Sequence, residues 1–144
     1  MAIVKITLKE GSVLPEYKTK GSAGADVAAL VNSPITIKPT ERAIIPTGIF
    51  LEIPENFEIQ VRPRSGLALQ HGITLLNTPG TIDSDYRGEL KLILINHGNE
   101  NFIVTNGMRL AQIIMAPVIQ AQFMLSNKLN STERNEGGFG HTGL

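Results

Sequence analysis

The sequence predicts an all-β fold, because short segments in which apolar and polar residues alternate follow one another along the chain. In residues 57–62, FEIQVR, the apolar Phe57, Ile59 and Val61 each precede a polar residue, which is the pattern of a strand with one buried face. Glycine, proline and asparagine separate such segments, as they do at turns. Only residues 65–71 favour a helix, and this segment is too short to organise the fold.

The expected strands can be placed in order along the chain. Alternation predicts them at residues 3–8, 35–38, 42–52, 57–62, 89–96, 101–104 and 110–123. The predicted helix ends before Gly72. The last residues, 129–144, are polar and glycine-rich, so we expect a mobile arm that follows a β-structured core of residues 1–128.

Length and charge limit the possible functions. A chain of 144 residues fits a single domain, residues 1–144. The 13 Lys and Arg residues balance the 13 Asp and Glu residues, so we expect no stable binding to nucleic acid and none to a membrane surface. The sequence has no membrane-length apolar run, no signal-peptide layout and no cysteine. We therefore expect a soluble, cytoplasmic protein without disulfides or thiolate metal sites.

Aromatic residues are few in this chain, with five Phe, two Tyr and no Trp. The core must therefore consist mainly of Ile, Leu and Val. We expect part of the apolar surface to be buried between subunits, so the composition favours an oligomer.

Residues 77–90, NTPGTIDSDYRGEL, combine a turn signal with acidic and aromatic side chains. Proline presets φ at one turn position and glycine accepts a positive φ at another, so Pro79-Gly80 predicts a chain reversal within a β-hairpin. A sheet would hold the next side chains rigidly, which suits residues that position a reactant. Asp83 is therefore the candidate general base, and a solvated turn aspartate is the alternative if it is considered alone.

Two other segments offer hydrogen-bond donors for phosphate oxygens. Residues 63–66, PRSG, place the guanidinium of Arg64, the hydroxyl of Ser65 and the amide of Gly66 at the end of a predicted strand. Residues 134–144, RNEGGFGHTGL, add further donors and one aromatic ring. Together these segments predict a site for a nucleotide with several phosphates.

Five motifs can be recognised in order along nearly the whole chain. They are SAGADVAAL from Ser22, PRSGLA from Pro63, LNTPGTIDSDYRGEL from Leu76, NGMRLAQ from Asn106 and RNEGGFGHTG from Arg134. In order and spacing they resemble the motifs of the trimeric dUTP pyrophosphatases (dUTPases). The resemblance implies a jelly-roll-like antiparallel β-barrel that forms a homotrimer, in which neighbouring subunits build each active site and a C-terminal arm covers it.

The resemblance also implies a reaction. Family members hydrolyse dUTP to dUMP and pyrophosphate, which limits uracil incorporation into DNA and supplies dUMP for dTMP synthesis. Asp83 would orient and deprotonate the water that attacks the α-phosphorus in line, with Mg²⁺ as the cofactor. Asp26 would hold waters of a Mg²⁺ that the triphosphate coordinates, and a helix or turn cap is the alternative for this carboxylate.

The motifs imply roles for the remaining site residues. Uracil recognition is implied for Asn77, Gly80, Thr81, Ile82 and Lys91. Phosphate binding is implied for Arg64, Ser65, Gly66, Gln112 and Arg134. The arm would close through Phe139, Gly140, His141 and Thr142, with Phe139 stacked on uracil.

Three further positions of these motifs are Tyr86, Arg109 and Asn135. Tyr86 would pack against the deoxyribose and fill the space of a 2′-hydroxyl, and an ordinary cross-strand aromatic is the alternative. Arg109 could equally brace the turn or a subunit interface, so it is left without a role. Asn135 stands where the family has a glycine.

Two other functions compete with dUTP hydrolysis. The homologous dCTP deaminases share the core sheet and the phosphate clamp, but they need an additional acid near the base. A regulatory module that reports nucleotide status to a protein partner through arm closure is a further possibility. Ammonia release from dCTP and nucleotide-dependent partner binding, respectively, would identify them.

Overall fold

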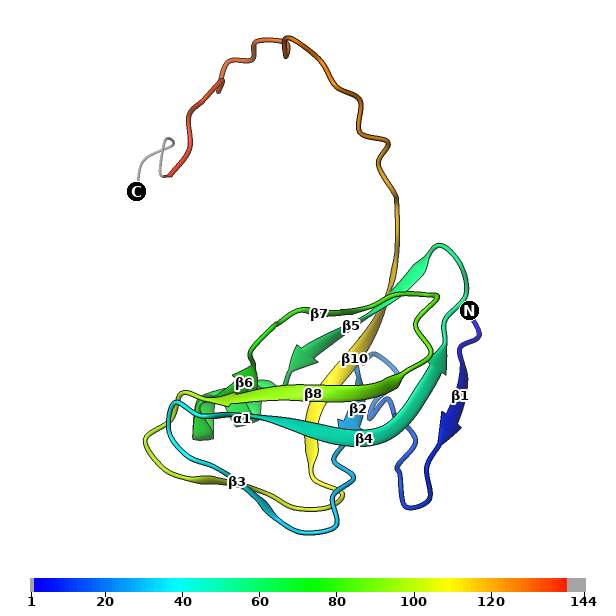
Figure 1. Ribbon diagram of the computed structural model, residues 1–144, viewed down its shortest axis with the longest axis vertical. Coiled ribbons are helices and arrows are strands. Elements are labelled where there is room, and N and C mark those ends of the chain that lie inside the picture. Colours follow the sequence, from blue (N-terminus) through cyan, green and yellow to red (C-terminus); the bar gives the residue numbers. More distant parts are fainter. Residues whose placement is uncertain (1, 140–144) are drawn as a thin grey trace.

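The computed structural model describes residues 2–139 of the chain. Strands and one seven-residue helix make up its regular structure, which confirms the all-β prediction (Figure 1). No helix in this described range has the length and apolar character of a membrane span. In chain order the elements are β1 (Lys5–Leu8), β2 (Ala25–Ala28), β3 (Ile35–Ile37), β4 (Arg42–Glu52), β5 (Phe57–Pro63), α1 (Ser65–His71), β6 (Ile73–Leu75), β7 (Gly80–Ile82), β8 (Glu89–Asn96), β9 (Phe102–Val104) and β10 (Arg109–Pro117).

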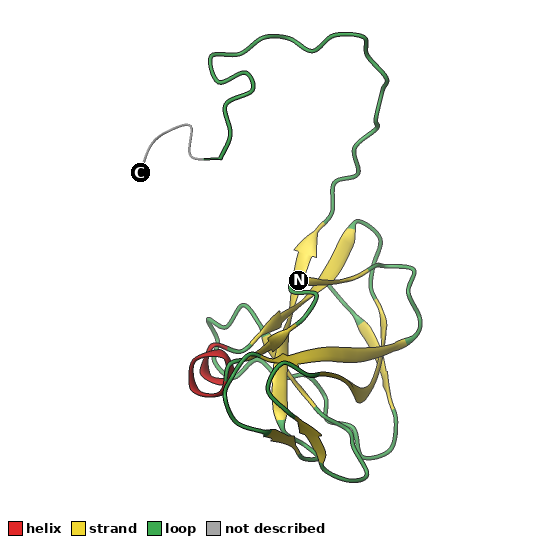
Figure 2. Ribbon diagram, turned by 60° about the vertical axis from the view of Figure 1, so that its left-hand side comes forward, coloured by secondary structure: helices red, strands yellow, loops and turns green. Residues whose placement is uncertain are grey.

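The strands form two four-stranded sheets and a two-stranded ribbon (Figures 1 and 2). The first sheet has the order β1-β4-β8-β6, the second has the order β2-β10-β5-β7, and the ribbon pairs β3 with β9. All of these pairs are antiparallel, as the jelly-roll-like prediction requires. Within the described residues the sheets stay separate, so the predicted barrel is not closed.

Apolar side chains of both sheets form one core. Along β8, buried positions alternate with more exposed ones, and Leu90, Leu92 and Leu94 are at most 1% exposed. Val27 of β2 and Val61 of β5 belong to the same cluster. The core therefore consists mainly of Ile, Leu and Val, as the composition predicts.

Residues 77–90 do not form the simple hairpin that the sequence predicts. The strands on either side of this region do pair, because Leu75 of β6 lies opposite Leu94 of β8. Between them, however, Gly80–Ile82 forms β7, which pairs with β5 of the other sheet. The segment therefore connects the two sheets, and the strands before and after Pro79-Gly80 are not paired with each other.

The last strand is shorter than the sequence predicts. We expect a strand up to Phe123, but β10 ends at Pro117, which lies opposite the first residue of β5, Phe57. The N–H of Val118 still donates to the carbonyl of Asn56 (2.8 Å). Beyond this bond, no described strand lies alongside the chain, so residues 119–123 have no partner strand although their apolar residues alternate.

Residues 118–139 extend away from the sheets as an irregular tail (Figures 1 and 2). Three of its apolar side chains, Ile119, Phe123 and Leu125, are at least 95% exposed. Clustered apolar exposure of this kind is typical of a segment that packs against another molecule.

Candidate active site

A polar cavity of about 450 Å³ lies where β2, β10 and the start of α1 meet. We call it the arginine cavity, because Arg64 and Arg109 both line it. Among the predicted site residues, it brings together Asp26, Arg64, Ser65, Gly66 and Gln112. Three segments far apart in the sequence therefore converge on one site.

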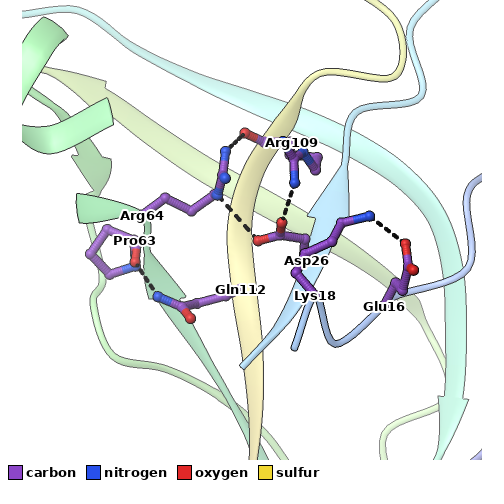
Figure 3. Close-up of polar contacts among 7 residues, drawn as sticks. All are labelled: Glu16, Lys18, Asp26, Pro63, Arg64, Arg109 and Gln112. Carbon is purple, nitrogen blue, oxygen red and sulfur yellow. Dashed lines mark hydrogen bonds and ion pairs between the residues drawn. The ribbon is translucent and has the colours of Figure 1, made fainter. Parts of the chain in front are cut away.

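Asp26 lies between two guanidinium groups in this cavity (Figure 3). Its Oδ1 is 3.1 Å from Nε of Arg64, and its Oδ2 is 2.9 Å from Nη1 of Arg109. The Asp26 side chain is only 15% exposed, so water and salt screen these ion pairs less than pairs at the surface. Two cations and one anion leave the group with a net positive charge, which favours an anionic ligand.

Gln112 is held in place from two sides. Its Nε2 donates to the backbone carbonyl of Pro63 at the end of β5 (3.0 Å) (Figure 3). On the other side, a Cβ atom at Gly24 would lie 2.2 Å from Oε1 of Gln112. Glycine leaves room for Gln112 in this position, which gives the glycine of the first motif a direct role in building the cavity.

The loop from β5 into α1 presents backbone donors to the cavity. Arg64 is extended, with φ −99° and ψ 129°, and the helix begins at Ser65. The first N–H groups of a helix have no intrahelical acceptor, so those of Ser65 and Gly66 are available to a ligand. A Cβ atom at Gly66 would meet nothing within 4 Å, so packing within the chain does not require glycine there. Close approach of a ligand to this backbone is one reason to have it.

Asp83 lines a different cavity, of about 460 Å³, which we call the Asp83 cavity. Its wall also contains Glu55, Glu58 and Asp85. The preceding residue, Ile82, packs against the core, while Asp83 itself is exposed. The backbone is thus held firmly while the carboxylate remains open to solvent. So many carboxylates would repel a triphosphate unless cations came from elsewhere.

The predicted uracil and ribose residues surround β7. Gly80 is buried, and a Cβ atom there would lie 3.3 Å from Nδ2 of Asn77. The Tyr86 hydroxyl donates to the backbone carbonyl of Glu89 (3.2 Å). A Cβ atom at Gly88 would lie 2.2 Å from the Tyr86 hydroxyl oxygen. Close packing against Gly88 therefore fixes how the Tyr86 ring lies.

The arginine cavity and the Asp83 cavity lie at opposite ends of β5. Arg64 directly follows this strand, whereas Asp83 follows Ile82, which pairs with Ile59 near the beginning of the strand. At about 3.3 Å per residue, the distance along β5 from Ile59 to Arg64 is roughly 15–20 Å. Within one chain, the predicted base and the predicted phosphate clamp therefore do not meet.

The remaining predicted site residues lie apart from both cavities. Lys91 is on β8 of the first sheet, opposite Pro46. In the tail, Nε of Arg134 donates to the carbonyl of Gly137 (2.8 Å), and the Phe139 side chain is fully exposed. The predicted roles of Gly140, His141 and Thr142 lie outside the described residues.

Asn135 fits the tail in spite of the family's glycine at this position. Its φ of 43° is in the left-handed region, which asparagine tolerates better than most residues. Its Oδ1 accepts from the N–H of Thr132 (2.9 Å), and its own N–H donates to the Thr132 hydroxyl (3.0 Å). The substitution therefore retains the backbone conformation that a glycine would allow.

No group of three or more His, Cys, Asp or Glu side chains is placed to hold a metal ion in residues 2–139. The one acidic residue of the arginine cavity, Asp26, has each carboxylate oxygen paired with a guanidinium. The residues present thus do not fit a directly bound metal. Contact from Asp26 through water to a metal that arrives with the substrate stays a prediction.

Sequence reasoning left Arg109 without a role, although it lines the arginine cavity. Residues three apart in a regular strand face opposite sides, so Arg109 and Gln112 should point apart. The structure contains a β-bulge between Arg109 and Ala111. An added residue in one strand re-aims the side chains that precede it, and here it brings Arg109 and Gln112 to the same cavity.

The fold and the arginine cavity together define an all-β protein with a positively charged polar cavity. The dUTPase family model matches residues 10–143. Over 137 residues the chain is 61% identical to a deoxyuridine 5'-triphosphate nucleotidohydrolase of Treponema denticola, covering 95% of each chain. Over the same length it is 59% identical to the enzyme of that name from Chlamydia pneumoniae, covering 94% of each. The chain therefore belongs to the dUTPase family.

Solved dUTPase structures share this fold. A mutant dUTPase of Staphylococcus bacteriophage 80alpha with dUpNHpp has a TM-score of 0.85 and 22% identity, covering 99% of each chain. A mutant dUTPase from phage phi11 of S. aureus has a TM-score of 0.79 and 20% identity, covering 88% of this chain and 97% of that one. The phage phi11 structure concerns the coordination of a structural Mg(II) ion.

Proposed function

We propose that this member of the dUTPase family hydrolyses dUTP to dUMP and pyrophosphate. The observation that supports it most directly is the arginine cavity, where five of the predicted site residues converge around a net positive charge. High identity to nucleotidohydrolases of the same length adds weight. The reaction limits uracil incorporation into DNA and supplies dUMP.

In the proposed reaction, Asp83 takes a proton from a water molecule as the water oxygen attacks the α-phosphorus. The bond from that phosphorus to the α,β-bridging oxygen breaks, and pyrophosphate leaves. Arg64, the Ser65 hydroxyl and the backbone N–H of Gly66 stabilise the charge that develops on the leaving group, and Gln112 binds a phosphate oxygen. Such positioning and charge neutralisation dominate phosphoryl transfer, and a general base adds roughly 10²–10⁴ in rate.

Specificity for deoxyuridine is proposed to come from the residues around β7. The polar edge of uracil would pair with Asn77, Thr81, Ile82 and the backbone at Gly80. The close approach of this backbone would exclude the thymine methyl group. Donors and acceptors fixed for uracil would leave the cytosine amino group mispaired, which discriminates more strongly than size does. The Tyr86 ring, held against Gly88, would occupy the space of a ribose 2′-hydroxyl.

The site is proposed to be composite, in a homotrimer. A base and a phosphate clamp must both come within hydrogen-bond reach of one triphosphate, but in one chain they lie at opposite ends of β5. A closed three-fold ring would place the Asp83 cavity of one subunit against the arginine cavity of the next. The exposed tail could then bring Arg134 and Phe139 to a neighbouring site. Lys91 would complete the binding of uracil.

Mg²⁺ is the proposed cofactor, bound by the triphosphate rather than by a protein cluster. The ion would neutralise phosphate charge when it is present. Asp26 would contact its waters, and the two guanidiniums already paired with this carboxylate would compete for it.

The test is pyrophosphate release with Mg²⁺ from dUTP, dCTP, dTTP and UTP in parallel. We expect turnover of dUTP alone, reduced at least about 10²-fold by Asp83→Asn. Asp85→Asn removes the same charge from the same cavity and should retain most of the turnover. Undiminished release by Asp83→Asn would remove the proposed base. Ammonia release from dCTP would instead favour a deaminase.

A further inference from the structure

We propose that Arg109 is a positioning residue for phosphate binding and acts through Asp26. Arg109 would hold Asp26, and Asp26 would hold Arg64 in the orientation in which its free N–H groups face a phosphate. The inference rests on the proposed function for the identity of the ligand, but it concerns a residue that the proposed reaction does not use. Arg109 itself would not touch the nucleotide.

The first step of the argument is the geometry of Arg64. Its Nε is paired with Asp26 (3.1 Å), and its Nη1 donates to the backbone carbonyl of Arg109 (3.0 Å). One N–H donor of the guanidinium, on Nη1, is thus hydrogen-bonded within the chain, and the ion pair with Asp26 holds the Nε side of the group. Because the guanidinium is planar, these two contacts together determine the direction in which its remaining N–H groups point. The carbonyl is a backbone group that a substitution of Arg109 leaves in place, so only the contact with Asp26 depends on the Arg109 side chain.

The second step is the balance of charge. Asp26 is the most buried member of the group, with 15% of its side chain exposed, against 30% for Arg64 and 48% for Arg109. Without Arg109, the Asp26 carboxylate would have Arg64 as its only cationic partner in the group. Arg64 would then be neutralised by Asp26 and would attract a phosphate less strongly.

The third step is the local backbone. The β-bulge between Arg109 and Ala111 turns Arg109 toward the cavity. Gln112 lies opposite Asp26 in the β10–β2 pair, so the bulge places Arg109, Asp26 and Gln112 together. A bulge interrupts the hydrogen-bond ladder of a sheet, and here the interruption builds the ion-pair group.

The test is a double-mutant cycle read out by ligand binding. Full-length Arg109→Gln is compared with the wild type, and Asp26→Asn/Arg109→Gln is compared with Asp26→Asn. Calorimetry in EDTA measures binding of the non-hydrolysable analogue dUpNHpp and, separately, of inorganic triphosphate. EDTA removes any contribution of Asp26 to a metal ion, and inorganic triphosphate reports on the phosphate pocket even if the chain does not hydrolyse dUTP.

We expect Arg109→Gln to raise the Kd for both probes roughly tenfold, since a charge-assisted contact is lost. In the Asp26→Asn background the same substitution should change Kd less than about twofold, because its only route to the ligand is gone. Arg109→Lys keeps the charge next to Asp26 and should restore binding to within about threefold of the wild type.

Three results would overturn the inference. An equal loss in both backgrounds would mean that Arg109 acts on the ligand without Asp26, by direct contact or through its charge. Unchanged binding in Arg109→Gln would mean that Asp26 does not need it. Failure of Arg109→Lys to restore binding, with thermal unfolding unchanged, would mean that the charge is not what matters.

Discussion

Asp83 and Arg64 lie at the two ends of the same pair of strands, β5 and β7, and line two different cavities. One cavity is acidic, and the other contains two arginines. Each provides what the other lacks for the hydrolysis of a triphosphate. This complementarity is the physical basis for expecting an active site shared between copies of the chain.

A shared site predicts that two inactive variants can rescue each other. Asp83→Asn and Arg64→Gln chains are unfolded, mixed in equal amounts and refolded, and pyrophosphate release is measured. In random three-fold rings, about a quarter of the sites would combine an intact Asp83 with an intact Arg64 from another chain. Each variant refolded alone is the control. A mixture no more active than the two controls would place both residues of a site in one chain.

Gly24→Ala should impair phosphate binding without unfolding the protein. The new Cβ would lie 2.2 Å from Oε1 of Gln112, so the Gln112 amide must shift from the position in which it binds the Pro63 carbonyl. We expect KM for dUTP to rise roughly tenfold, in line with the loss of one good hydrogen bond to a charged group. Gly21→Ala is the matched control, because a Cβ there would meet nothing within 4 Å. Equal KM values for the two variants would contradict the packing argument.

Asn96→Ala should be one of the most destabilising single substitutions in the core. Asn96 is fully buried, and its Nδ2 donates to the carbonyls of Ile37 (2.9 Å) and Glu100 (2.8 Å), while its Oδ1 accepts from the N–H of Gly98 (2.8 Å). The alanine variant leaves these backbone groups without a partner, at a cost of about 2–4 kcal/mol in the free energy of unfolding.

Urea unfolding measures this loss. Asn101→Ala, at an exposed position, is the control and should change the free energy of unfolding by less than about 0.5 kcal/mol. Similar values for the two variants would show that the three bonds of Asn96 contribute little.

Glu89 should make stability depend on pH in the acidic range. Burial raises the pKa of Glu89, but hydrogen bonds from Lys9 and from the N–H of Gly48 (2.9 Å each) outweigh it and lower the pKa below the ordinary value of 4.5. A group with a lowered pKa in the folded state binds fewer protons there than in the unfolded state. Its contribution to stability is therefore present above pH 4.5 and is lost as the pH falls through the folded-state pKa.

The difference in free energy of unfolding between the wild type and Glu89→Gln should thus be largest near pH 6 and shrink toward pH 3. Denaturant titrations at several pH values measure it. Glu10→Gln, at an exposed position, is the control. A difference that grows as the pH falls would have the wrong sign for a lowered pKa.

Local patterns predicted the elements that depend on local properties. The bounds of β4, β8 and α1 match those expected from alternation and from Gly72 as a stop signal. The short strands β2 and β6 were not predicted as strands, because four and three residues are too few to show a period. The end of β10 was misplaced because it depends on where its partner β5 begins.

In the candidate site, too, features that depend on local sequence were predicted, and features that depend on pairing between distant segments were not. The donor groups of Arg64, Ser65 and Gly66 were predicted from their chemistry, and the structure gathers them in one cavity. The position of Asp83 in another cavity depends on strand pairing between distant segments, which a single sequence does not show. Arg109 was left without a role because its motif position suited a brace of the turn or of a subunit interface equally well, and the sequence pattern does not show the β-bulge that turns it toward the cavity.

β7 is three residues long and lies at the edge of its sheet. Its register on β5 is fixed by three pairs, and Ile82 is its anchor in the core. A slip of one residue would turn Ile82 toward solvent and aim Asp83 at the opposite face. The direction in which the Asp83 carboxylate points is therefore set by the hydrophobic packing of Ile82 against the core. Substitution of an apolar core residue beneath β7 could abolish turnover although every polar residue of the site is unchanged.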